Sequence, residues 1–324
     1  MLPLPRPKTN RIPYWKTALK GFFLSVIAGG GIFACAEVAV WAYPPVFALG
    51  WGLIERNAVC SLAEVFQGAR QHYHQQRIAD RTRKSCRLIE KDAGGHSLWE
   101  TPLGRFWVPA GSEHALPVLV AQQQVDIYGQ PGRGVRPGDV VLDCGAHVGV
   151  YTRKALDGGA KLVVAIEPAN ANVECLLRNF IQEISQGRVI VVPKGVWNEE
   201  AVLPLFEDPD NTAADSFAMR GTNHILARQI PLTTIDKLAA ALRLERVDLV
   251  KMDIKGAASK ALLGAKGVLA RCHPRLVIST EERDDDPSGL METLRQSGLS
   301  YRASCGACSL NAKQQLDPDV MFLH

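Results

Sequence analysis

The chain has 324 residues, of which 47% are hydrophobic and 22% charged, a composition that predicts a folded protein with a sizeable core. A disordered tail protein, a collagen and a disulfide-stapled miniature domain are excluded. The net charge of +4 is unevenly spread, because residues 1–95 carry 13 Lys/Arg against 6 Asp/Glu and residues 96–324 carry 24 against 27. The basic excess lies beside an apolar run, which favours a membrane surface over a nucleic acid as partner.

That apolar run, residues 21–54, contains Glu37 as its one acidic or basic side chain, and it is long enough to cross a hydrocarbon layer of roughly 30 Å. We predict an uncleaved membrane segment here, preceded by a basic tail at 1–20. Glu37 and the Tyr-Pro-Pro at 43–45 leave two arrangements open, a single span and a re-entrant hairpin with both ends on one side.

The next part of the chain, 55–95, is predicted to be a helical linker, because apolar residues recur at loose helical spacing up to residue 92. The segment 98–109 predicts a short hairpin around Pro102, Leu103 and Gly104. We place the start of a catalytic domain, 96–324, at this point.

Beyond residue 138 short apolar strands alternate with helical stretches. The strands are expected at 140–143, 162–167, 188–192, 247–253 and 275–278. The helices are expected at 149–156, 170–184, 257–269 and 288–297. Further strands are predicted at 201–207 and 228–233, with a final antiparallel edge strand at 317–323 beside 299–303. This alternation predicts an α/β fold with a parallel sheet covered on both faces.

Eight cysteines are scattered along the chain, with one close pair, Cys305 and Cys308. A metal site would need a second pair or histidines at ligand spacing. We therefore predict no metal, and two reduced thiols in a turn between late strands.

The first sheet strand leads into the turn DCGAHVGVYT, residues 143–152. Gly145 and Gly149 allow a sharp turn and a close approach to a ligand, while the following helix directs free N–H groups at it. Glu167 ends the second strand, from which an acid accepts hydrogen bonds from a ribose diol. A dinucleotide would favour G-x-G-x-x-G, whereas Asp143 at the strand end suits a cationic ligand. The turn therefore favours S-adenosylmethionine over a nicotinamide cofactor.

From about residue 135 to 324 the sequence resembles the FkbM-type S-adenosylmethionine-dependent methyltransferases. The matching stretches are DCGAHVGVYT, AIEPANANVECLLRNF, PLTTIDKL and VDLVKMDIKGA, in the family's order. The resemblance implies a Rossmann-like class I methyltransferase sheet of seven strands whose last strand is antiparallel. It also implies methyl transfer to a hydroxyl of a sugar, polyketide or related small molecule.

Carried over to this sequence, the resemblance assigns the cofactor to one turn and the strand beside it. The turn would contribute Asp143, Gly145, His147, Gly149, Tyr151 and Thr152. Glu167 would bind the ribose hydroxyls, with Pro168 and Asn172 on the adenine or ribose side. For Asn172 a helix-capping or surface role stays open.

The acceptor side departs from the family pattern, because D-x-E-G-A-E appears here as DIKGAAS. Lys255 and Ala258 stand where the pattern has glutamates, which leaves turnover open. Asp253 remains as a candidate catalytic group, Glu281 after the fifth strand is a second, and Lys255 itself is a third. Lys255 paired with Asp253 is the alternative to a catalytic lysine.

These features predict a membrane-associated O-methyltransferase that acts on a sugar, glycolipid or related small molecule and whose catalytic domain faces the cytoplasm, where the donor is made and where basic flanks remain. Two other hypotheses are a degenerate S-adenosylmethionine-binding scaffold and, less favoured, an NAD-dependent oxidoreductase. The oligomeric state is left open.

Overall fold

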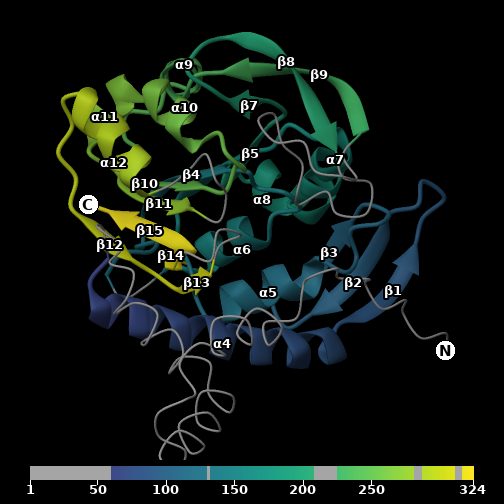
Figure 1. Ribbon diagram of the computed structural model, residues 1–324. Coiled ribbons are helices and arrows are strands. Elements are labelled where there is room, and N and C mark those ends of the chain that lie inside the picture. The colour runs from purple at the N-terminus through teal and green to yellow at the C-terminus, as the bar shows by residue number, and fades with distance from the viewer. Residues whose placement is uncertain (1–59, 130–131, 208–224, 281–286, 311–315) are drawn as a thin grey trace, which may run out of the picture.

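The fold is described from a computed structural model over residues 60–129, 132–207, 225–280, 287–310 and 316–324 (Figure 1). Its centre is a seven-stranded sheet in the order β12-β15-β11-β10-β4-β5-β6. The strands β4, β5, β6, β10 and β11 are parallel, and β15 is antiparallel to both of its neighbours. The predicted α/β class and the antiparallel last strand are confirmed, but that strand lies between β12 and β11 and not at the predicted edge of the sheet.

The parallel strands form because short β-branched runs bury both of their faces. They are β4 (Val140–Cys144), β5 (Leu162–Ile166), β6 (Val189–Val192), β10 (Leu249–Met252) and β11 (Arg275–Ser279). Every residue of β4 and β10 is buried.

Helices cover both faces of the sheet, as the alternation predicted. One face packs against α9 (Ile235–Ala241), α10 (Ala258–Leu263), α11 (Lys266–Cys272) and α12 (Pro287–Gln296). The other packs against α6 (Val150–Asp157) and α7 (Asn170–Asn179), which α8 (Ile181–Ser185) follows.

Two predicted helices are each divided. The predicted helix 257–269 breaks after Leu263, where a Cβ on Gly264 would lie 2.1 Å from the carbonyl oxygen of Trp197. The predicted helix 170–184 breaks at Phe180, which is fully buried.

Strands outside the central sheet form smaller sheets and a terminal hairpin. The predicted pair 201–207 and 228–233 appears as β8 (Ala201–Glu207) and β9 (Ile225–Thr233), with β7 (Gly195–Val196) parallel to β9. The predicted last strand is interrupted at Asp319, between β14 (Leu316–Pro318) and β15 (Val320–Leu323). β14 pairs with β13 (Cys308–Leu310), and β12 (Ala303–Cys305) is the edge strand beside β15.

The N-terminal described region differs from the prediction of one helix up to residue 92. Helix α4 (Leu62–Ser85) ends earlier, and β1 (Arg87–Lys91) pairs with β2 (Ser97–Thr101) across the predicted domain boundary. Backbone pairing with β2 outweighs the weak helical pattern there. The predicted hairpin of β2 and β3 (Gly104–Val108) is confirmed, and α5 (Leu116–Gln124) follows without having been predicted.

The predicted membrane segment, 21–54, and the basic tail, 1–20, lie outside the described residues. Within the described part of the chain, none of the helices combines the length and the apolar character that a membrane crossing requires.

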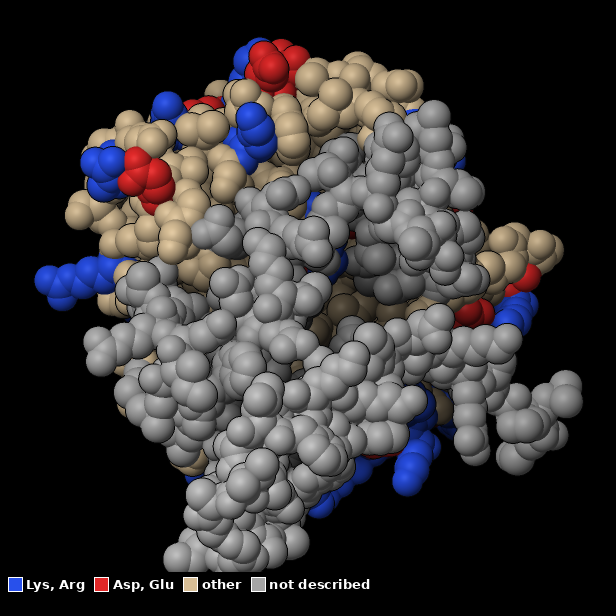
Figure 2. Space-filling model, viewed as in Figure 1, with Lys and Arg blue, Asp and Glu red and all other residues tan. Residues whose placement is uncertain are grey.

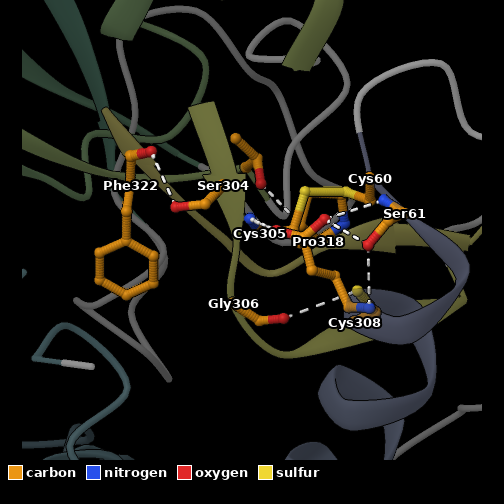
Figure 3. Close-up of a disulfide and its surroundings, with 10 residues drawn as sticks. Cys60, Ser61, Ser304, Cys305, Gly306, Cys308, Pro318 and Phe322 are labelled. Carbon is orange, nitrogen blue, oxygen red and sulfur yellow. Dashed lines mark hydrogen bonds between the residues drawn. A yellow bond between two sulfur atoms is a disulfide. The ribbon is translucent and has the colours of Figure 1, made fainter. Parts of the chain in front are cut away.

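A disulfide joins the start of α4 to the edge of the central sheet (Figure 3). Cys60 pairs with Cys305, 245 residues away, whereas Cys308 is outside this disulfide and its buried thiol donates to the carbonyl of Gly306 at 3.7 Å. The prediction of two reduced thiols is therefore wrong for Cys305, because its partner is distant in sequence and close in the fold. The disulfide fastens α4 to the central sheet.

Candidate active site

A cleft opens at the carboxyl ends of β4, β5 and β10, under the inner side of α5. Strand order reverses around β4, so the cleft lies where ligands bind in open α/β sheets. Its cavity has a volume of about 80 Å³, counted as the space open to the centres of water-sized molecules.

The turn after β4 forms one wall of the cleft, and its backbone requires two glycines. Gly145 has φ +77°, and a Cβ there would lie 2.1 Å from the carbonyl oxygen of Asp253. Gly149 has φ +91°, and a Cβ there would lie 2.2 Å from the ring of Phe180. His147 also has positive φ, at 51°, and burial lowers its pKa to about 4. The imidazole is therefore neutral at physiological pH.

Glu167 lies across the cleft, at the end of β5, and is 5% exposed. Its Oε1 accepts from the amide of Ala169 at 3.0 Å and from Asn172 Nδ2 at 3.2 Å, and its Oε2 accepts from the amide of His147 at 2.9 Å. Burial raises its pKa, and these hydrogen bonds oppose the rise. Each carboxylate oxygen accepts about two hydrogen bonds, so Oε2 retains capacity for one ligand hydroxyl.

Asp143 lies behind the turn, away from the cleft wall, and is fully buried. Lys251 Nζ donates to its Oδ1 at 3.0 Å, and Thr152 Oγ1 donates to its Oδ2 at 2.7 Å. The same Nζ donates to the carbonyl of Gly145 at 2.8 Å and lies 5.6 Å from the ring centres of Tyr128 and Tyr151. Asp143 thus holds the turn through a buried ion pair.

Asp253 occupies the far end of the cleft, just after β10. Tyr128 donates its hydroxyl to Oδ2 at 3.0 Å, and Lys255 Nζ lies 3.4 Å from Oδ1. Burial opposes ionisation of Asp253, but Lys255 and Lys251 outweigh it and lower the pKa to about 2. The paired arrangement expected as the alternative for Lys255 is the one present. Asp253 is therefore a stable anion and a weak base.

Besides Oδ1 of Asp253, whose neighbour is the ammonium of Lys255, two further buried polar atoms of the cleft wall stand out because they form no hydrogen bond with other described residues. They are the hydroxyl of Tyr151, which is 6% exposed, and Oε1 of Gln123, which is 3% exposed. A buried polar group without a partner costs free energy, so these atoms suit a polar ligand. The carboxylate and ammonium of a methionine moiety are such groups.

The predicted residues divide between the wall and its support. Gly145, His147, Tyr151, Glu167, Pro168, Asp253 and Lys255 line the cleft. Asp143, Thr152 and Asn172 are buried and support the wall through hydrogen bonds. Glu281 lies outside the described residues.

Sequence reasoning missed Gln123, Tyr128, Lys194 and Lys251, which also line the cleft. A lysine inside the apolar strand Leu249–Met252 was a usable signal, because a buried charge requires a partner. Gln123 lies in α5, which was not predicted, and Tyr128 follows it. No sequence motif marks either residue. No group of metal-ligating side chains is found among the described residues.

Residues 143–302 match the model of the methyltransferase FkbM domain. The match agrees with the predicted family and with its cofactor, S-adenosylmethionine. No curated protein matches the sequence.

Several solved methyltransferase structures match the chain, at low sequence identity and with TM-scores below 0.5. The methyltransferase FkbM from Methylobacillus flagellatus KT is 17% identical over 81% of this chain, with a TM-score of 0.44, and the alignment spans 62% of that protein. An S-adenosylmethionine-dependent methyltransferase from Agrobacterium tumefaciens is 12% identical, with a TM-score of 0.38 over 73% of this chain and 75% of that one. SMU.776, a putative methyltransferase in complex with SAH, is 11% identical, with a TM-score of 0.38 over 74% and 55% of the two chains.

Proposed function

We propose that the chain binds S-adenosylmethionine in the cleft and transfers its methyl group to a hydroxyl of a sugar, glycolipid or related small molecule, because residues 143–302 match the model of the methyltransferase FkbM domain. The observation that carries the proposal is the pair of unpartnered polar atoms, on Tyr151 and Gln123, beside the carboxylate of Glu167. These groups match the two polar ends of the donor, its methionine part and its ribose.

In this proposal each part of the cleft has one task. Tyr151 and Gln123 hold the amino-acid end, and Oε2 of Glu167 accepts from a ribose hydroxyl. Asp253, which remains ionised, accepts from the acceptor hydroxyl and orients its oxygen toward the donor methyl. Alignment supplies most of the rate. The proton of the acceptor hydroxyl passes to solvent as the methyl group is transferred, since a carboxylate with a pKa of about 2 is a weak base.

Donor binding is tested by calorimetry with S-adenosylmethionine and its demethylated product. We expect Glu167→Gln to weaken binding about tenfold, the effect of weakening one hydrogen bond to a charged acceptor. Glu199→Gln, at an exposed position beyond β7, is the control and should bind as the native chain does. Tight binding of NAD in place of both adenosyl compounds would support the oxidoreductase alternative and remove the proposal.

Turnover is tested separately, by transfer of a labelled methyl group to a membrane extract. Asp253→Asn should lower the rate more than it lowers donor affinity. Donor binding without transfer by the native chain would favour the scaffold alternative, for which the ion pair of Lys255 with Asp253 is the specific argument.

The proposed cellular setting is a membrane surface, with residues 21–54 as the anchor and the catalytic domain on the cytoplasmic side. The supply of donor and the basic residues that follow the anchor support this setting. A nucleic-acid acceptor is disfavoured because the basic excess lies in residues 1–95, outside the part that forms the cleft.

A further inference from the structure

Helix α4 presents a continuous basic stripe on the side that faces away from the domain. The stripe consists of Arg70, His74, Arg77, Arg81 and Lys84, all of them exposed. At 100° per residue the five side chains fall within an arc of about 80°, and they extend over about 21 Å of helix. No acidic residue of α4 lies inside that arc, since Glu64 and Asp80 project outside it.

The opposite side of α4 packs against the rest of the domain. The helix packs on α5 and on β13, and Val65, Gly68 and Thr82 are buried there. The Cys60–Cys305 disulfide fixes its first turn, which a capping box of Ser61 and Glu64 closes. The stripe is therefore held in one orientation relative to the catalytic cleft.

The basic side chains of the stripe form no polar contact with other described residues. None of the five side chains has a hydrogen bond or ion pair there, whereas the neighbouring Arg83 pairs with Asp80 at 3.6 Å. In Figure 2 blue side chains gather along the lower rim, where Figure 1 places α4. Aligned like charges without counterions cost free energy, and an anionic partner would remove that cost.

Two large apolar side chains are exposed beside the C-terminal end of the stripe, among the charged residues of β1. Leu88 and Ile89, on the edge strand β1, are 41% and 38% exposed. Large exposed side chains next to a basic helix face suit a bilayer interface, where charges meet headgroups and apolar side chains enter the acyl boundary. A nucleic acid would use the charges but not these two side chains.

We propose that the basic stripe of α4 lies on an anionic phospholipid surface and thereby holds the cleft in one fixed orientation relative to the membrane. This inference rests on the proposed membrane setting, because the apolar segment 21–54 ends eight residues before α4 begins. The helix must then start close to the headgroups.

The test uses the full chain in flotation assays with vesicles of phosphatidylcholine alone and with vesicles that also contain phosphatidylglycerol. The variant R70Q/R77Q/R81Q/K84Q removes four charges from the stripe. The control K161Q/K260Q/K266Q/R302Q removes four exposed charges elsewhere on the domain. Thermal unfolding establishes that all three proteins fold.

We expect the native chain and the control to prefer the anionic vesicles, and the stripe variant to lose at least about tenfold of that preference, since each basic residue near an anionic surface contributes about 1 kcal/mol. Added salt should reduce the preference of the native chain. Equal loss in the control, or no preference in the native chain, overturns the proposal, as does stripe-dependent binding of duplex RNA without any vesicle preference. If the native chain binds anionic vesicles but not neutral ones, the result argues against a membrane anchor at 21–54 and not against the basic stripe.

Discussion

Lys251 is the side chain on which the geometry of the cofactor turn depends most. It is 3% exposed, and its ammonium joins β10 to β4 through Asp143 and to the turn through the carbonyl of Gly145. A buried ion pair is costly to form and more costly to break, because the partner left behind keeps an uncompensated charge.

We therefore predict that Lys251→Met lowers the free energy of unfolding by about 3 kcal/mol. Adding Asp143→Asn should recover part of the loss, because the stranded carboxylate is then neutral. Chemical denaturation of both single variants and the double variant measures the coupling. Strictly additive losses would show that the two side chains do not depend on one another.

His147 also lines the cleft, but its low pKa gives it a different role. Burial lowers the pKa to about 4, so the ring takes up a proton only well below neutral pH. We predict that His147→Asn leaves the pH dependence of methyl transfer unchanged above about pH 5, since both side chains are neutral there. The loss of a rate limb near pH 6.5 in the variant would contradict this prediction and identify His147 as a base.

At the scale of elements, the contact of α4 with β13 depends on a glycine. A Cβ on Gly68 would lie 2.6 Å from both the amide nitrogen of Cys308 and the carbonyl oxygen of Gly306. Both atoms belong to the backbone, which has little room to move. In an exposed helix, replacing glycine with alanine stabilises by about 1 kcal/mol.

We predict the opposite sign at this position, namely that Gly68→Ala lowers the thermal midpoint of the protein. Gln67→Ala, on the exposed side of the same turn, is the matched control and should leave the midpoint unchanged or raise it. If Gly68→Ala is as stable as the control, α4 is not packed as closely as the structure places it.

The elements that could be predicted from the sequence are those whose signal is local. The strands around Val141 and Val164 are short β-branched runs. Gly145 and Gly149 predict a tight turn because glycine readily adopts positive φ. Helix α5 was missed because its packing partner α4 is distant in the sequence. The edge strand β1 was missed because its pairing with the nearby strand β2 overrides a weak helical pattern. The buried ion pair that supports the cleft wall was not predicted, because Lys251 pairs with Asp143, 108 residues earlier in the sequence.

At the scale of the whole molecule, the Cys60–Cys305 disulfide links the start of helix α4 to strand β12, near the end of the chain. It closes a loop of 245 residues. Such a cross-link restricts the unfolded chain, so its removal lowers the free energy of unfolding by about 2–4 kcal/mol. Its presence conflicts with the proposed cytoplasmic setting, where thiols are kept reduced. The donor supply and the disulfide therefore favour opposite sides of the membrane.

Alkylation of intact cells before lysis decides between the two sides. If the domain faces the cytoplasm, we expect Cys60 and Cys305 to be labelled as free thiols and the disulfide to form only after purification. The purified oxidised protein should then lose about 2–4 kcal/mol of unfolding free energy on reduction, and Cys60→Ser/Cys305→Ser should be insensitive to the reductant. Cys144, fully buried, is an internal control that reacts only after denaturation. Protection of Cys60 and Cys305 in the cells would place the domain on the oxidising side, where a methyl donor made in the cytoplasm would first have to cross the membrane.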